Sequence, residues 1–230
     1  QSDLRMLILT DYIKKEECDK IKTEQEFNSL SVVSIFETLR RKGFEKLACL
    51  SGSLIILPIS IQKELNKRNI SYTLSEIEDT SYGYYSFAGL NKQKVEIIND
   101  LFQDGLIDIL IGTASLLGEG FDSPCINSLI LASYVGSFVL SNQMRGRAIR
   151  IDPNNPNKTA NIFHLVTIEP EYIFKDKKIA QLEAFIQEDR STFISQDYET
   201  LKRRFRSFIG PNYTTGDLES GINRITLIKG

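Results

Sequence analysis

The sequence predicts an α/β fold, in which a parallel sheet is sandwiched by helices and followed by a mostly helical C-terminal extension. Apolar runs of strand length, such as residues 4–12 and 128–133, show no polar alternation, as expected for strands buried on both faces. Segments with apolar residues at helical spacing separate these runs. After about Glu169 the alternation ends and helical spacing dominates. We therefore predict a domain over residues 1–168 and an extension over 169–230.

The composition indicates a globular protein without a membrane segment. The 230 residues suffice for one domain of ordinary size plus an appendage, and 41% of them are hydrophobic. No apolar run approaches the ~18 residues of a membrane helix, and residues 1–12 do not resemble a signal peptide. We expect a cytoplasmic protein with no membrane partner.

The net charge of −2 gives no global attraction to nucleic acid, so such binding would depend on local basic groups. The candidates are residues 40–42, the arginines within 145–150, and the segment KRRFR at 202–206. For each run, an exposed and solvated face is the alternative.

The cysteines and the single histidine do not predict a metal or catalytic site. Cys18, Cys49 and Cys125 are scattered without a CxxC pair, which favours reduced thiols over a disulfide framework or a zinc site. His164 lies inside the apolar run NIFHLVTI, where a hydrogen-bonded strand histidine is the favoured interpretation. We expect this chain to hold no metal.

The predicted elements follow one another along the chain. Strands are expected at 4–12, 47–52, 107–113, 128–133 and 161–168, with two more inside 70–89; helices are expected at 31–43, 59–68, 91–105, 138–150 and 196–208, with helical spacing also over 179–186. The charged stretch 14–28 predicts a solvated loop or a short exposed helix. A polar, glycine-containing tail ends the sequence.

The segment IGTASLLGEGFDSP at 111–124 is the first candidate site. We expect a loop there, in which Gly118 and Gly120 let the backbone turn tightly or approach a ligand closely, and from which Asp122 projects. Ligands of open α/β sheets bind in such loops at the carboxyl ends of strands. The alternative is an ordinary loop with a turn aspartate.

The segment QMRGRAIR at 143–150 is the second candidate site. Arg147 and Arg150 are three residues apart and share one helix face, with Gly146 leaving the surface beside them uncrowded. Two guanidinium groups on one face offer paired donors to phosphate oxygens. A buried salt-bridge cluster could use the same pattern.

Together and in this order, the two segments resemble motifs V and VI of superfamily 2 helicases. Residues Gln143, Gly146, Arg147 and Arg150 match the family form Q-x-x-G-R-x-x-R, and Glu119, Gly120, Asp122 and Pro124 match E-G-x-D-x-P. The wording QxRGR is especially similar to the branch of Dicer-type and innate-sensor RNA helicases, and strand 4–12 resembles the one near motif IV. The resemblance covers residues 1–168, although 12–30 and 51–58 match no part of the pattern. Thr113 departs from it by preceding Gly120 by seven residues instead of six.

The resemblance implies a RecA-like domain that shares ATP and Mg²⁺ with an upstream RecA-like domain of the same polypeptide. No GxxxxGK[ST] loop and no suitably placed DExx sequence occurs in this chain, so we expect the other domain to hold the phosphates and the metal. By resemblance, Arg147 is the arginine finger, Arg150 a second phosphate or ribose contact, and Gln143 a residue that positions them. Asp122 would meet the ribose or orient an arginine, beside Glu119 and Gly120.

The resemblance also implies a DNA or RNA partner. Contacts to its phosphate backbone are expected from hydroxyl, amide and cationic side chains, namely Ser86, Asn91, Lys92, Thr113 and Ser115. Segment 202–206 could add charge, with Phe205 stacking on a base or packing inside the extension.

Two other functional classes of protein stay open as alternatives. A small-molecule α/β enzyme is disfavoured, because no glycine-rich phosphate loop follows the first strand and no Ser/His/Asp or Cys/His set is apparent. A non-catalytic interaction module is disfavoured by the presence of Arg147 and Arg150.

Overall fold

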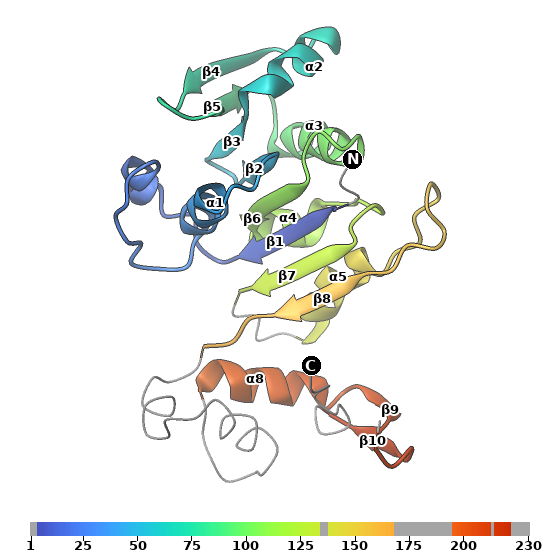
Figure 1. The fold of residues 1–230 in the computed structure, drawn as a ribbon. Helices are drawn as coiled ribbons and strands as arrows, with labels where there is room; N and C mark the ends of the chain where they lie inside the picture. Colours follow the sequence, from blue (N-terminus) through green and yellow to red (C-terminus); the bar gives the residue numbers. More distant parts are fainter. Residues whose placement is uncertain (1–3, 134–137, 168–194, 213, 222–230) are drawn as a thin grey trace. The chain divides into compact units, whose positions relative to one another are not determined.

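The computed structural model divides the chain into two compact units (Figure 1). The structure describes residues 4–133, 138–167, 195–212 and 214–221. The first unit comprises residues 1–135 and 139–165, and the second comprises 136–138 and 166–230.

An eight-stranded sheet forms the centre of the first unit, in the order β4-β5-β3-β2-β6-β1-β7-β8 (Figure 1). The strands are β1 (Met6–Thr10), β2 (Leu47–Leu50), β3 (Ile55–Pro58), β4 (Tyr72–Glu76), β5 (Tyr82–Phe87), β6 (Ile109–Thr113), β7 (Ser128–Ala132) and β8 (Asn161–His164). β2, β6, β1, β7 and β8 run parallel, as predicted. The sheet then continues antiparallel through β3, β5 and β4, a direction that the sequence analysis did not anticipate.

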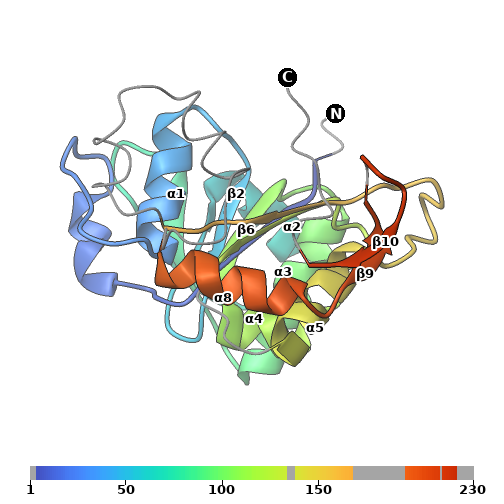
Figure 2. The same ribbon diagram turned by 90° about the horizontal axis from the view of Figure 1, so that it is seen from below.

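Helices cover both faces of the sheet (Figure 2). They are α1 (Val32–Arg41), α2 (Gln62–Lys67), α3 (Asn91–Gln103), α4 (Ala114–Gly120) and α5 (Phe138–Ala148), with short 3-10 turns η1 (Lys15–Lys20) and η2 (Ile59–Ile61). Because side chains alternate along a strand, Leu7 and Leu9 pack on the α2, α3, α4 and α5 side while Ile8 packs on the α1 side. The predicted two-sided burial is confirmed for the central parallel strands β1, β2 and β6.

Helix α3 begins and ends as its sequence predicts. The four residues Val95, Ile98, Leu101 and Phe102 form its buried face. Gly105 follows with φ of 76°, the left-handed conformation that glycine adopts at little cost after a helix. The chain then enters β6 beside β1 and β2.

The charged segment 14–28 is tied to α1 through Glu37, whose side chain is fully buried. Its carboxylate accepts the backbone N–H of Lys22 at 3.0 Å and forms ion pairs with Arg40 at 2.6 Å and Arg41 at 2.9 Å. Burial alone would raise the pKa of Glu37, but the hydrogen bonds from the two arginines outweigh it and lower that pKa. Arg40 and Arg41, which were candidates for binding nucleic acid, therefore serve the fold.

The last strand of the sheet is shorter than predicted. β8 ends at His164, and its residues alternate between exposed and half-buried, in contrast to the buried β1 and β6. Among the described residues, β8 lies at the edge of the sheet and pairs with β7 alone, so one side of its backbone faces no described strand. His164 is half-buried on this edge strand.

The described part of the second unit contains a helix and a hairpin. Helix α8 (Gln196–Phe205) begins at Ser195, whose side chain accepts the backbone N–H of Tyr198, and it confirms most of the helix predicted over 196–208. The antiparallel pair β9 (Ile209–Pro211) and β10 (Leu218–Ser220) lies in the tail, where no strand was predicted. Phe205 packs on Phe208, with ring centroids 5.6 Å apart. The helical spacing over 179–186 lies outside the described residues.

Within the described ranges, no helix is both long and apolar enough to cross a membrane. The same residues contain no group of three or more His, Cys, Asp or Glu side chains placed to hold a metal ion.

Candidate functional site

The first candidate segment forms a helix, and the prediction of a loop over 114–120 is wrong. Strand β6 passes directly into α4, which begins after Thr113 and ends at Gly120. The sequence ASLL accounts for this, because these residues tolerate a helix and Leu117 is fully buried in the core. Helix α4 therefore leaves Thr113 and Ser115 at the carboxyl end of β6 and carries the chain away from that end before Asp122.

Asp122 lies instead on the side of the amino ends of the strands. Asn127, five residues later, accepts the backbone N–H of Arg5 at 2.9 Å, and Arg5 immediately precedes β1. The side chain of Asn99, in the third turn of α3, donates to the backbone carbonyl of Asp122 at 3.0 Å. Phe121 is fully buried against Phe102, with ring centroids 6.1 Å apart. These contacts fix the backbone from which Asp122 projects.

Asp122 and Arg150 form an ion pair between the two candidate segments. The pair is accessible, since 63% of the Asp122 side chain and 48% of the Arg150 side chain are exposed. An exposed pair of this kind contributes about 0–1 kcal/mol to stability. The Asp122–Arg150 pair therefore contributes little to the stability of the fold, and its two exposed groups are available to bind a ligand.

Arg147 lies one helical turn before Arg150 and is buried, with only 8% of its surface exposed. Burial lowers the pKa of its guanidinium, as does the nearby charge of Arg150, while the Asp122 carboxylate opposes this shift. Arginine stays protonated in proteins, so this guanidinium carries a positive charge. We call Asp122, Arg147 and Arg150 the arginine site.

The other residues predicted for this site lie on the same elements. Gln143 is exposed on α5, one turn before Arg147. Apart from its chain neighbours and its own helix, no described residue comes within 4 Å of a Cβ built on Gly146, so the described surface beside Arg147 is open. Glu119 and Gly120 are the last two residues of α4, and the side chain of Glu119 lies outside the described residues. Two guanidiniums with one carboxylate suit an anionic ligand such as a phosphate.

A second region lies at the carboxyl ends of β1, β2 and β6. There a cavity of about 450 Å³ is lined by Asp11, Tyr12, Ile13, Gly52, Asn91, Thr113, Ser115 and Leu116. We call it the strand-end pocket. It brings together three residues predicted to contact nucleic acid, namely Asn91, Thr113 and Ser115. The hydroxyls of Thr113 and Ser115 lie 3.4 Å apart.

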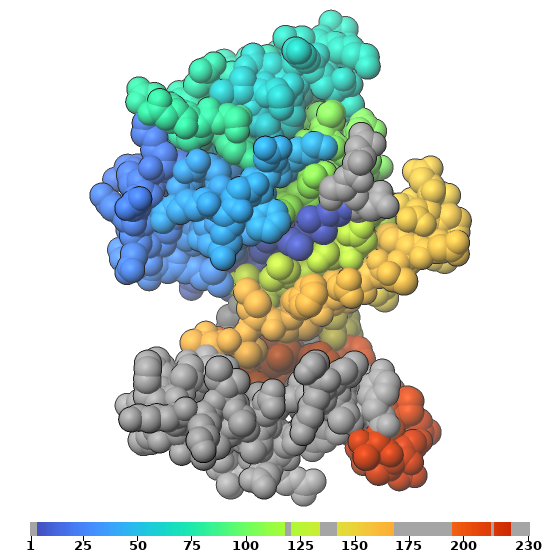
Figure 3. Space-filling view, in the orientation of Figure 1, coloured from blue at the N-terminus to red at the C-terminus, as the bar shows by residue number. Residues whose placement is uncertain are grey.

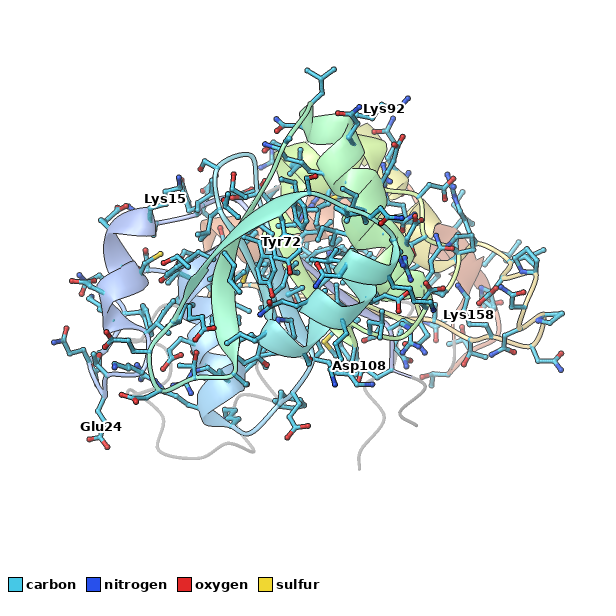
Figure 4. The ribbon with its side chains drawn as sticks, turned by 90° about the horizontal axis from the view of Figure 1, so that it is seen from above. Lys15, Glu24, Tyr72, Lys92, Asp108 and Lys158 are labelled. Carbon is cyan, nitrogen blue, oxygen red and sulfur yellow. The ribbon has the colours of Figure 1, made fainter. Side chains whose placement is uncertain are left out.

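The other two predicted contacts do not line this pocket. Ser86 is exposed on β5, opposite Thr73 of β4, in the antiparallel part of the sheet. Lys92 is exposed next to Asn91 at the start of α3. Figure 4 shows Lys92 well apart from Asp108, which precedes β6, so the two labels mark opposite ends of the strands.

Sequence reasoning missed Tyr12 and Lys158. Tyr12 is 62% exposed at the rim of the strand-end pocket, but in the sequence it reads as the end of a strand. Lys158 lies in the polar loop after α5, beside a cavity of about 340 Å³ that Pro124, Asn127 and Asp152 also line. Nothing in the run DPNNPNK distinguishes this lysine from an exposed loop residue.

Residues 44–152 match the family model of the helicase conserved C-terminal domain. The match includes β2 to α5, and with them both candidate segments. The chain is therefore similar to this helicase domain over residues 44–152, slightly less than half of its length. Its mostly parallel sheet with helices on both faces is the RecA-like fold that the resemblance implied.

Solved structures with similarity to the chain include the following three. The C-terminal part of the Fun30 ATPase domain is 18% identical, with a TM-score of 0.38 over 85% of this chain and 42% of that one. A putative HsdR subunit of a type I restriction enzyme from Vibrio vulnificus YJ016 is 16% identical, with a TM-score of 0.37 over 71% and 24%. The Hef helicase domain of Pyrococcus furiosus is 18% identical, with a TM-score of 0.35 over 75% and 24%. The chain spans less than half the length of each of these structures. No curated protein matches the sequence.

Proposed function

We propose that this chain is the arginine-bearing half of an ATP-dependent helicase or translocase that acts on DNA or RNA. The observation that carries the proposal is the arginine site, where buried Arg147 and the Asp122–Arg150 ion pair bring the two candidate segments together. In this proposal, an upstream RecA-like domain of the same polypeptide holds the phosphates and Mg²⁺ of ATP.

Arg147 and Arg150 would stabilise negative charge that grows on the transferred phosphoryl group. A guanidinium in a poorly solvated position acts more strongly on such charge than one in water. Arg147 meets this condition through its burial. Asp122 would hold Arg150 in place until the ligand arrives, and the open surface at Gly146 would let the ligand approach α5.

The strand-end pocket would hold the sugar-phosphate backbone of the nucleic acid. Hydroxyl and amide donors at Thr113, Ser115 and Asn91 suit phosphate oxygens and do not discriminate between bases. The proposal therefore predicts binding that is insensitive to sequence.

The test is the ATPase activity of the full-length protein with Arg147 replaced. Arg147→Ala should lower kcat by about 10³- to 10⁵-fold with little change in ATP affinity, because an arginine finger acts on the transition state. Arg147→Lys should restore little, since lysine lacks the planar fork of donors.

Arg68→Ala is the matched control, because Arg68 is a second partly buried arginine at the end of a helix, but it pairs with Glu64 and Asp104 at the end of α2. It should keep near-normal kcat. A normal kcat in Arg147→Ala would overturn the proposed role and leave Arg147 as a structural residue.

A further inference from the structure

Lys158 donates from its ammonium group to three backbone carbonyls of the first unit. Its Nζ bonds to the carbonyl oxygens of Pro124, of Ile126 at 2.7 Å and of Ala148 at 3.1 Å. A lysine ammonium has three N–H donors, so these three acceptors use all of its capacity. Burial lowers the pKa of Lys158, and the carboxylate of Asp152 opposes that shift.

The three carbonyls belong to the two segments that form the arginine site. Pro124 lies two residues after Asp122, and Ile126 lies in the same stretch before β7. Ala148 is the last residue of α5, between Arg147 and Arg150, and it is fully buried. Carbonyls at the end of a helix have no helical partner and favour a positive charge. One cation therefore joins the backbone beside Asp122 to the backbone beside both arginines.

The loop that carries Lys158 is itself held in shape. Asp152 is 8% exposed, and its carboxylate accepts the backbone N–H of Asn154 at 2.9 Å. Its carbonyl accepts the N–H of Asn155, whose carbonyl in turn accepts the N–H of Lys158, each at 3.0 Å. Figure 3 shows this loop standing out from the body of the first unit, and Figure 4 labels Lys158 on the side away from Lys92. Successive turns thus return the chain from solvent and direct Lys158 inward.

We propose that Lys158 is a positioning residue that clamps the segment Asp122–Asn127 to the last turn of α5 and so fixes Asp122, Arg147 and Arg150 relative to one another. The inference rests on the proposed function, since it assigns to Lys158 the role of positioning the residues of the arginine site. An ion pair as exposed as Asp122–Arg150 is too weak to set the distance between two segments alone. Charge-assisted hydrogen bonds to three carbonyls are stronger and less accessible to water.

Amide hydrogen exchange of the full-length protein without nucleotide tests the clamp directly. Lys158→Met keeps the aliphatic stem and removes the donors. It should accelerate exchange in both 123–127 and 146–150 by about 10-fold or more, the factor expected when hydrogen bonds to a charged group are removed. Lys46→Met is the control, because Lys46 donates to one backbone carbonyl, of Gly105 at 3.1 Å, far from α5 in the chain. It should leave both segments unchanged.

ATPase kinetics then show whether the clamp serves the arginine site. Lys158→Met should lower kcat about 10-fold or more with little change in KM for ATP, while Lys46→Met should change neither. In an Arg150→Ala background, Lys158→Met should lower kcat by a much smaller factor. Lys158 holds Arg150 in position, and that arginine is already absent in this background. The effect of Lys158→Met on exchange should persist in that background.

Three outcomes would overturn the inference: unchanged exchange in either segment, unchanged kcat, or an equal loss of kcat in both backgrounds. If Lys158→Met does not fold, Lys158→Gln retains two amide donors, and it should show the same pattern at smaller amplitude. If the wild-type protein hydrolyses no ATP, or Arg147→Ala is fully active, the proposed function fails instead, and the exchange experiment still decides whether the clamp exists.

Discussion

The strand-end pocket and the arginine site lie at opposite ends of one short helix but use different chemistry. Thr113 and Ser115 at the start of α4 line the pocket, while Asp122 just beyond its end pairs with Arg150. The pocket is lined by neutral donors and by Asp11, and no lysine or arginine is among its lining residues. The arginine site is built from charges. The comparison teaches that the pocket can position a ligand, whereas the arginine site can stabilise charge on one.

Helix α4 joins the two regions tightly. Its seven residues span about 10 Å at 1.5 Å per residue. Leu117 in its middle and Phe121 at its end are both fully buried. The regions therefore share a stiff connection, and substitutions can be chosen that affect one region, the other, or the helix between them.

After Arg147→Ala, the largest effect is expected from Arg150→Ala in the full-length protein. We expect kcat for ATP hydrolysis to fall by about 10²- to 10³-fold, the range for removing one preorganised donor to developing charge. The free energy of unfolding should change by no more than about 1 kcal/mol, because the Asp122–Arg150 pair is exposed. Nucleic-acid affinity should stay the same. ATPase assays, denaturant unfolding and a binding titration measure the three quantities.

Asp122→Asn is the companion variant for this prediction. It keeps the size of the side chain and a hydrogen-bond acceptor for Arg150 while removing the charge, so its kcat should lie between those of the wild type and Arg150→Ala. A loss of nucleic-acid affinity in either variant as large as the loss of kcat would break the separation between the two regions.

Substitutions at Gly112 and Gly146 distinguish a glycine that is needed for packing from one that is needed at the arginine site. A Cβ on Gly112 would lie 2.6 Å from the carbonyl oxygen of Leu50 and 2.3 Å from Cδ1 of Leu117, so the close packing of α4 on β6 requires glycine. Gly112→Ala should lower the free energy of unfolding by about 1–3 kcal/mol, a factor of roughly 5–150 in the unfolding constant. Both functions should weaken together in this variant, because α4 is displaced.

Gly146→Ala should affect kcat without lowering stability, in contrast to Gly112→Ala. No atom lies within 4 Å of the added Cβ, and alanine favours a helix over glycine by up to about 1 kcal/mol. Stability should hold or rise while kcat falls, if the open surface beside Arg147 serves the approach of ATP. Unfolding curves and ATPase rates for the two alanine variants decide the matter. Destabilisation by Gly146→Ala would count against the open surface.

These glycines illustrate what the sequence could and could not predict. The parallel strands and α3 follow from apolar runs and helical periodicity, and QMRGRAIR identified both arginines of the site. β3 was not among the predicted strands, and the antiparallel direction of β4 and β5 was missed, because an apolar run such as LIILP is the same in either orientation. The loop predicted over 114–120 was wrong, since two glycines at the end of a segment also suit the end of a helix. Lys158 was missed because its three acceptors are backbone carbonyls, which leave no mark on the sequence.

A smaller effect is expected from the strand-end pocket. Thr113→Val combined with Ser115→Ala should weaken nucleic-acid binding by about 5- to 30-fold, because each hydroxyl contributes about 1 kcal/mol as a neutral donor. The salt dependence of binding should stay the same, since no charge is removed. Basal ATPase without nucleic acid should be unchanged. A weaker salt dependence would show that the pocket acts through nearby charges, such as Lys92. The contrast between a neutral pocket and a charged arginine site would then not hold.

The smallest effect is expected from α8, which belongs to neither region. Lys202 is paired with Glu199 at 3.0 Å and lies over the ring of Tyr198, and Arg203 donates to Thr200 at 3.4 Å. Since these interactions hold two of the three cations within their own helix, replacing Lys202, Arg203 and Arg204 together by alanine should weaken nucleic-acid binding only a few-fold. The measurement is a salt titration of the full-length protein and the triple variant. Each phosphate that the variant no longer neutralises should reduce the slope of log affinity against log salt by about 0.7–0.9, so a change near one unit would assign α8 a single phosphate. An unchanged slope would make α8 a packing element, with Phe205 on Phe208 as its core. A decrease in affinity larger than that of the pocket variant would reverse the comparison, because the main grip on nucleic acid would then lie in the second unit.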